Sequence, residues 1–121
     1  MNPVGWFEIP VTDMDRAETF YRSLLGYKLE RHEMGPNLMS WFPMERDAAQ
    51  ATGTLIKGEA YTPSHEGTII YFSAPDLEAT LEKVEGLGGR VLVPKTDIGE
   101  HGYIAHIEDT EGNRIALHRT K

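Results

Sequence analysis

The chain has 121 residues, 19 acidic and 12 basic side chains and a net charge of −7. Its size suits one domain, and its scattered lysines and arginines argue against nucleic acid or an anionic membrane surface as a partner. The absence of cysteine excludes disulfides, thiolate nucleophiles and cysteine metal ligands. No apolar run is long enough for a membrane span, and the first predicted strand leaves no room for a signal peptide, so we expect a cytoplasmic protein.

The first half of the chain predicts a helix that follows one strand and precedes three others. Residues 4–11 have strand character, and Asp13 stands just before an amphipathic helical pattern that Gly26 ends. A polar stretch, residues 45–52, precedes the last strand. The three later strands are expected at residues 27–34, 37–44 and 53–57.

The second half predicts the same order. A strand at residues 68–73 precedes a helix that begins after Asp76 and ends at Gly88 and Gly89. Three strands are then expected at residues 90–93, 103–108 and 114–118.

When the first half of the sequence is shifted by about half the chain length, it matches the second half. Asp13 then falls on Asp76, and Gly26 falls on Gly89 at the end of the second helix. Repetition at this scale is an architectural signal, because neither half could bury its sheet face alone. We therefore expect two modules within one domain, residues 1–58 and 67–121, joined by a linker at 59–66.

The last two strands form a predicted hairpin. Asp109, Gly112 and Asn113 favour a tight turn with a left-handed glycine. Side chains alternate along a strand, so Ala116 and His118 should point to one face of the sheet.

Several short motifs give the chain a resemblance to the vicinal oxygen chelate superfamily, which includes glyoxalase I, extradiol dioxygenases and the fosfomycin and bleomycin resistance proteins. The resemblance covers nearly all of the chain. It implies an α+β fold in which two βαβββ modules form an open barrel of curved sheets around a cavity, and it implies a homodimer. The motifs are Val11-Thr12-Asp13, Phe20-Tyr21, Leu25-Gly26, Gly88-Gly89 and Asp109-Thr110-Glu111-Gly112-Asn113.

In the metal-dependent members of this superfamily, His, Gln or Glu ligands come from the first and last strands of each module. The resemblance places those positions on Trp6, on Thr54 or Ile56, on Ile70 and on Ala116. None of these side chains is a good ligand for a divalent ion. We therefore predict no metal at the inherited position and no cofactor.

Two polar residues lie close to those positions, and both are candidate catalytic residues. Glu8 should share a face with Trp6, as His118 should with Ala116, so a carboxylate and an imidazole could act as a general base pair or, with Glu59 or another histidine, as a displaced metal site. Alternatively, Glu8 pairs with a basic group or backbone donor, and His118 meets water near the C-terminus. Because a carboxylate is costly to bury in an apolar strand, Glu8 is the preferred candidate.

The remaining histidines and aromatic residues carry weaker signals. His32 and His65 are expected to be solvated, and His106 to face outward. His101 and Tyr103 belong to a loop and strand start that could fold over the cavity mouth, or form an ordinary hairpin loop. An apolar cluster is expected to be at least half core and otherwise a ligand wall: Met39, Trp41, Phe42 and Met44.

Three classes of function follow from these observations. The first is metal-free binding of a small organic molecule in the cavity between the two modules. The second is a metal-dependent lyase or dioxygenase with a displaced site, and the third is a non-catalytic interaction scaffold. The first is preferred, and its expected ligand-binding residues are Trp6, Glu8, Trp41, His101, Tyr103 and His118.

Overall fold

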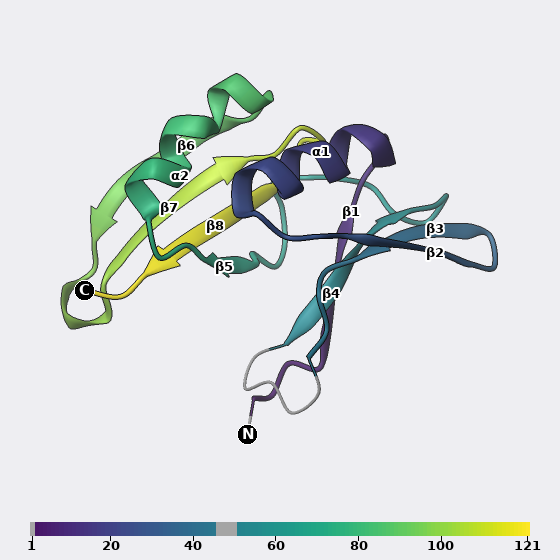
Figure 1. Cartoon of the computed structure of the whole chain (residues 1–121), viewed down its shortest axis with the longest axis horizontal. Helices are drawn as coiled ribbons and strands as arrows, with labels where there is room; N and C mark the ends of the chain where they lie inside the picture. Colours follow the sequence, from purple (N-terminus) through teal and green to yellow (C-terminus); the bar gives the residue numbers. More distant parts are fainter. Residues whose placement is uncertain (1, 46–50) are drawn as a thin grey trace. The chain divides into compact units, whose positions relative to one another are not determined.

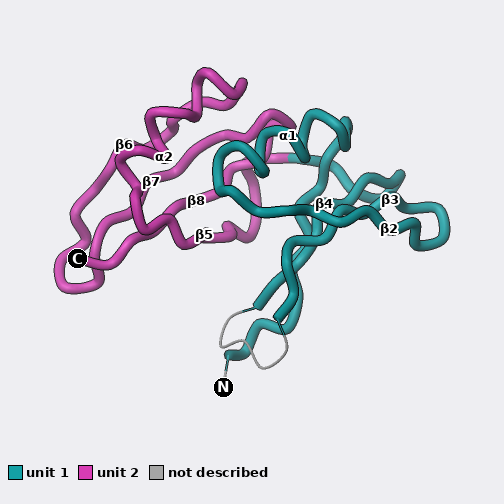
Figure 2. Tube along the Cα trace, in the orientation of Figure 1, with its two compact units in different colours: residues 1–63 teal, residues 64–121 magenta. Residues whose placement is uncertain are grey.

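The computed structural model describes residues 2–45 and 51–121, so part of the polar stretch expected at 45–52 lies outside the described residues. The chain divides into two compact units, Met1–Pro63 (unit 1) and Ser64–Lys121 (unit 2) (Figure 2). Each unit is an open, curved, four-stranded mixed sheet with one α-helix, in the order β-α-β-β-β (Figure 1). The α+β class is confirmed. Among the described residues, no helix is long and apolar enough to cross a membrane.

In unit 1, the first and last strands in chain order lie side by side in the sheet. Its strand order is β1-β4-β3-β2, and β4 runs parallel to β1 and antiparallel to β3. The elements are β1 (Trp6–Pro10), α1 (Met14–Leu25), β2 (Glu30–Met34), β3 (Asn37–Trp41) and β4 (Thr52–Lys57).

Local capping sets both ends of α1. The carboxylate of Asp13 accepts a hydrogen bond from the backbone N–H of Arg16 at 3.0 Å, and Gly26 ends the helix in a left-handed conformation with φ of 78°. Both ends agree with the sequence prediction. The core of unit 1 holds apolar side chains of α1 and of the sheet: Ala17, Phe20, Tyr21, Leu24, Ile9, Val11, Phe42 and Leu55.

A polar cluster also joins α1 to the sheet. Glu18 on α1 is only 7% exposed, and its carboxylate accepts hydrogen bonds from the Ser40 hydroxyl at 2.6 Å and from Arg31 Nη2 at 2.7 Å. Arg31 also pairs with Asp15. The hydrogen bond from Arg31 holds the pKa of Glu18 below its ordinary value, although burial opposes this shift. The charged cluster therefore belongs to the folded state of unit 1.

Unit 2 repeats this topology with the strand order β5-β8-β7-β6, in which β8 runs parallel to β5 and antiparallel to β7. Its core holds buried side chains of α2, β7 and β8, including Leu77, Ile107 and Leu117. The elements are β5 (Tyr71–Ser73), α2 (Leu77–Lys83), η1 (Glu85–Leu87), β6 (Arg90–Asp97), η2 (Gly99–His101), β7 (Tyr103–Glu108) and β8 (Arg114–Arg119).

Three elements of unit 2 differ clearly in length from the sequence prediction. The strand expected at residues 68–73 is β5, which spans only Tyr71–Ser73. The α-helix ends at Lys83 and a 3-10 turn continues to Leu87, around Gly86, a residue type that weakens α-helices. In contrast, β6 continues beyond Val93 and through Pro94. It can do so because β6 is an edge strand and its pairing with β7 shifts register along this stretch, which accommodates a residue without a backbone N–H.

The terminal turn has the predicted form. The carboxylate of Asp109 accepts hydrogen bonds from the backbone N–H groups of Glu111 at 2.8 Å and Asn113 at 2.9 Å, and Gly112 has φ of 93°. The side chain of Asp109 thus closes the turn, and only glycine adopts the φ of Gly112 without strain.

Candidate functional site

The face of the unit 1 sheet opposite α1 carries the expected aromatic residues. Strand register places Glu8 beside Thr54 and Thr54 beside Trp41, and alternation adds Trp6 to the same face. The side chains of Trp6 and Trp41 meet edge to face, with ring centroids 5.6 Å apart and an interplanar angle of 81°. The structure therefore brings together the two tryptophans that the sequence analysis selected.

His32 completes this aromatic face, which we define by Trp6, His32 and Trp41. Its ring stacks on Trp41 with centroids 3.8 Å apart and an interplanar angle of 27°. The expectation that His32 is simply solvated was wrong, because β2 pairs with β3 in a register that places the two rings on the same face. Trp6 remains 36% exposed, so one edge of the aromatic face is open to solvent.

The other members of the apolar cluster divide between core and surface. Met39 and Phe42 are buried, Trp41 is half-buried and Met44 is exposed. The indole Nε1 of Trp41 is buried and has no hydrogen-bond partner among the described residues. A buried indole N–H normally has an acceptor, so this donor on the aromatic face lacks its usual partner within the described part of the chain.

Glu8 is exposed, not buried as the apolar character of β1 suggested. It alternates with Phe7 and Ile9, which face the helix side, and so lies on the open face with Trp6. Its side chain interacts with that of Tyr61. Burial raises the pKa of Tyr61, and the negative charge of Glu8 raises it further. Glu8 therefore lies exposed beside Tyr61, on the open face of the sheet.

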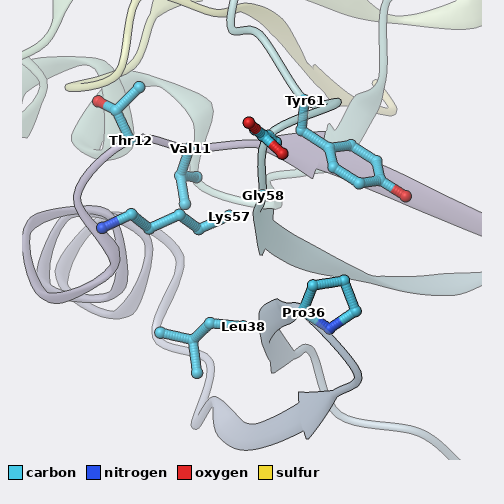
Figure 3. Close-up of a pocket in the computed structure, with 8 residues that line it drawn as sticks. Val11, Thr12, Pro36, Leu38, Lys57, Gly58 and Tyr61 are labelled. Atoms are coloured by element: carbon cyan, nitrogen blue, oxygen red, sulfur yellow. The ribbon is translucent and has the colours of Figure 1, made fainter.

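A shallow pocket of about 420 Å³ lies beside this pair, within unit 1 (Figure 3). Tyr61 connects it to Glu8, and Lys57 and Glu59 give it one charge of each sign. Its lining consists of Val11, Thr12, Pro36, Leu38, Lys57, Gly58, Glu59 and Tyr61. Glu59, a candidate partner of Glu8 and His118 in a displaced metal site, thus lies in this pocket.

His118 lies on β8 of unit 2, half-buried, with Nε2 2.6 Å from the backbone carbonyl of His101. The ring thus contacts the backbone of the loop before β7, and β8 continues past His118 to Arg119. The side chain of His101 itself is exposed, and only its backbone carbonyl takes part in the contact.

Tyr103 pairs with Arg119 and faces the opposite side of the sheet from His118. The guanidinium of Arg119 lies 4.3 Å from the ring centroid of Tyr103.

His106 was expected to face outward, but it is only 8% exposed. It lies on β7, an inner strand of the sheet, and both of its ring nitrogens have partners. Nδ1 accepts from Nε of Arg114 at 2.9 Å, and Nε2 lies 3.2 Å from the hydroxyl of Tyr71. Sequence reasoning missed Tyr71 and Arg114, and only the strand register brings these three residues together.

The positions inherited for a metal do not fit one. Trp6, Ile70 and Ala116 have no ligand atom, and Thr54 and Ile56 are buried in β4. Within neither unit, among residues 2–45 and 51–121, do three His, Asp or Glu side chains gather in a group that could hold an ion. We therefore derive no chemical step through a metal.

Comparison with known proteins places this architecture in a family. Residues 4–117 match the model of the Glyoxalase/Bleomycin resistance protein/Dioxygenase superfamily. The chain belongs to this superfamily. A Glyoxylase-like domain-containing protein of Didymella fabae is 32% identical over 94% of this chain and 91% of its own length. The CFP32 protein of Mycobacterium bovis is 28% identical over 93% of this chain, which spans only 44% of that longer relative.

Solved structures of the superfamily share the fold. A glyoxylase/bleomycin resistance protein/dioxygenase domain from Frankia sp. EAN1pec has a TM-score of 0.77 and 15% identity, with coverage of 100% of this chain and 99% of that one. TnmS3, an antibiotic binding protein from Streptomyces sp. CB03234, has a TM-score of 0.68 and 20% identity, with coverage of 100% and 98%. At these identities the likeness concerns the fold alone.

We predict that this member of the superfamily purifies without a stoichiometric divalent metal, because the inherited positions offer no ligand set. Elemental analysis should find Ni, Zn, Fe and Mn well below one ion per chain. One tightly held ion per chain that is lost on substitution of Glu8 or His118 would contradict the prediction and support a displaced metal site.

Proposed function

We propose that this protein binds a small organic molecule with an aromatic or cationic portion, without a metal, and that the aromatic face of unit 1 is the binding surface. The observation that carries the proposal is the N–H of Trp41, which has no acceptor among the described residues, within a cluster of rings that remains partly open at Trp6. A ligand with a hydrogen-bond acceptor would satisfy this donor, and its apolar part would cover the exposed edge of Trp6.

Charge supports a cationic group on the ligand. Glu8 lies on the same sheet face as Trp6 and interacts with Tyr61, so a bound cation would find a carboxylate beside an indole ring. Tryptophan is the ring that attracts cations most strongly, and a carboxylate gives the cation a directional partner. The net charge of −7 would also favour the approach of cationic molecules.

The fold is compatible with such a role. TnmS3, which has this fold, is an antibiotic binding protein. We propose by analogy that this chain sequesters a small molecule and breaks no bond in it. Fold does not determine function, so the proposal depends on the residues of the aromatic face.

Tryptophan fluorescence tests the proposal directly. Titration with 1-methylquinolinium, a flat aromatic cation, should quench the fluorescence of Trp6 and Trp41 in a saturable way. Trp6→Leu should weaken binding about ten-fold or more, because it removes the open ring. Calorimetric titration of the same variants should give the same change in affinity and exclude simple collisional quenching.

Glu8→Gln separates charge from shape, since it keeps the size of the side chain and removes the negative charge. It should weaken binding of 1-methylquinolinium and leave the binding of neutral quinoline unchanged. Glu33→Gln, on the exposed strand β2, is the matched control for a general loss of negative charge. Equal affinity of wild type and Glu8→Gln for the cation would refute the assignment of Glu8.

Assembly as a homodimer is part of the proposal. Each unit is an open sheet, with β1 and β2 at the edges of one sheet and β5 and β6 at the edges of the other, and a two-fold partner could cover such edges. Light scattering at micromolar concentration should give twice the chain mass of 13.6 kDa. A monomeric mass would contradict this part of the proposal.

A further inference from the structure

The sheet face of unit 2 opposite α2 carries a hydrogen-bonded chain of three side chains. They come from three strands: Arg114 from β8, His106 from β7 and Tyr71 from β5. The register places Tyr71 and His106 on either side of Ala116, and Arg114 is two residues before Ala116 on the same face. The contacts are 2.9 Å from Arg114 Nε to His106 Nδ1 and 3.2 Å from His106 Nε2 to the hydroxyl of Tyr71.

Arg114 determines which nitrogen of His106 carries the proton. A guanidinium can only donate, so Nδ1 must be the acceptor, and the proton of the neutral ring must be on Nε2. Burial lowers the pKa of His106, and the positive charge of Arg114 lowers it further, so the ring stays neutral at pH 7. His106 Nε2–H therefore donates to the oxygen of Tyr71.

This donation fixes the role of the Tyr71 hydroxyl. Because its oxygen accepts from His106, its own proton points away from the histidine, and no acceptor for that proton occurs in the described part of the chain. Tyr71 is 50% exposed, so the proton is accessible to a molecule in solution. A phenol O–H that is oriented by a buried neutral imidazole is a preorganised donor.

The charges around this hydroxyl favour a negative partner. The charged groups on the same face are Arg114, Arg90 and Glu108, and the carboxylate of Glu108 is engaged by His65 at 2.6 Å and by Arg90 at 3.4 Å. Glu78 and Asp97 pair elsewhere, with Arg119 and Lys121. The face therefore has a local excess of positive charge in a chain whose net charge is −7.

We propose that Tyr71 is the anchor of a second binding site, which takes the carboxylate of a small organic acid. Tyr71 donates to one carboxylate oxygen, Arg114 supplies the favourable potential, and His106 and Arg114 act as positioning residues for the hydroxyl. The site stands on unit 2 alone and does not depend on the aromatic face of unit 1.

Benzoate and its uncharged counterpart benzamide are the probes, with binding followed by amide chemical shifts in the intact chain. Benzoate should bind more tightly than benzamide, with shift changes centred on Tyr71 and Ala116. Tyr71→Phe should raise the Kd for benzoate about ten-fold, because a hydrogen bond to a charged group is lost. Tyr103→Phe, a tyrosine on the opposite face of the same sheet, should leave it unchanged.

Imidazole nitrogen spectra test the positioning role. A purely structural role of Arg114 would leave the tautomer of His106 unchanged. Wild-type His106 should be the neutral Nε2–H tautomer at pH 7. Arg114→Leu should raise the pKa of His106 and mix its tautomers. The absence of benzoate binding at millimolar concentration, equal affinity in wild type and Tyr71→Phe, or an Nδ1–H tautomer would overturn the proposal. Trp6→Leu should leave the benzoate affinity unchanged. The proposal for this site and the proposal for the aromatic face are therefore tested independently.

Discussion

Gly102→Ala should lower the free energy of unfolding by about 3 kcal/mol, as measured by urea denaturation. Gly102 precedes β7 with φ of 108°, a conformation that residues with a side chain rarely adopt. An added Cβ would also lie 2.0 Å from the backbone oxygen of Arg119. Two costs therefore combine, since the backbone is strained and the paired strands β7 and β8 must separate locally.

Gly99→Ala is the matched control, because it isolates the cost of the backbone conformation. Gly99 lies in the same loop with φ of 85°, but no atom lies within 4 Å of its added Cβ. This variant should lose only about 1 kcal/mol. An equal loss in both variants would show that the contact with Arg119 contributes nothing and would contradict the prediction.

Glu18→Gln should lower the free energy of unfolding by about 2 kcal/mol at pH 7, because the buried carboxylate accepts hydrogen bonds from both Arg31 and Ser40. The amide keeps the size of the side chain but accepts at only one oxygen and carries no charge. Part of the cost is avoided because Arg31 is partly exposed and keeps its pairing with Asp15. Thermal and urea denaturation should agree on the loss.

The pH dependence of this loss follows from the lowered pKa of Glu18. A carboxyl group whose pKa is depressed by folding stabilises the protein above its ordinary value of 4.5, and this contribution is lost as the pH falls through the folded-state pKa. The difference between wild type and Glu18→Gln should therefore be largest at neutral pH and should shrink below about pH 4.5. Glu33→Gln, on an exposed position of β2, should show no comparable loss. A difference that stays constant down to pH 2 would contradict the role of the charge.

The parts of the fold that the sequence predicted are those set by short-range chemistry. Asp13 caps α1 through the backbone N–H three residues further on, and Gly26 ends the same helix. Asp109 closes a turn within four residues. Each of these features depends on neighbours in the chain. Alternation along β1 and β8 likewise placed Glu8 with Trp6 and His118 with Ala116 without knowledge of the rest of the molecule.

The residues that were misjudged depend on strand register. His32 stacks on Trp41 because β2 pairs with β3 at one particular offset, and His106 is buried because β7 lies between β6 and β8. Tyr71 reaches His106 from β5, a strand that is distant in sequence, whereas Arg114 lies on the other strand of the β7–β8 hairpin. Had the pairing of β5 with β8 been known, the alternation of Tyr71, Ala116 and His106 on one face would have indicated their contact.

The parallel pairing of first and last strands gives each unit a particular order of assembly. In unit 1, β1 can pair only with β4, since β4 lies between β1 and β3 in the sheet. A nascent chain therefore cannot complete this sheet until Lys57 has left the ribosome. During that interval Phe7 and Ile9 on β1 lack the strand with which β1 pairs in the folded unit.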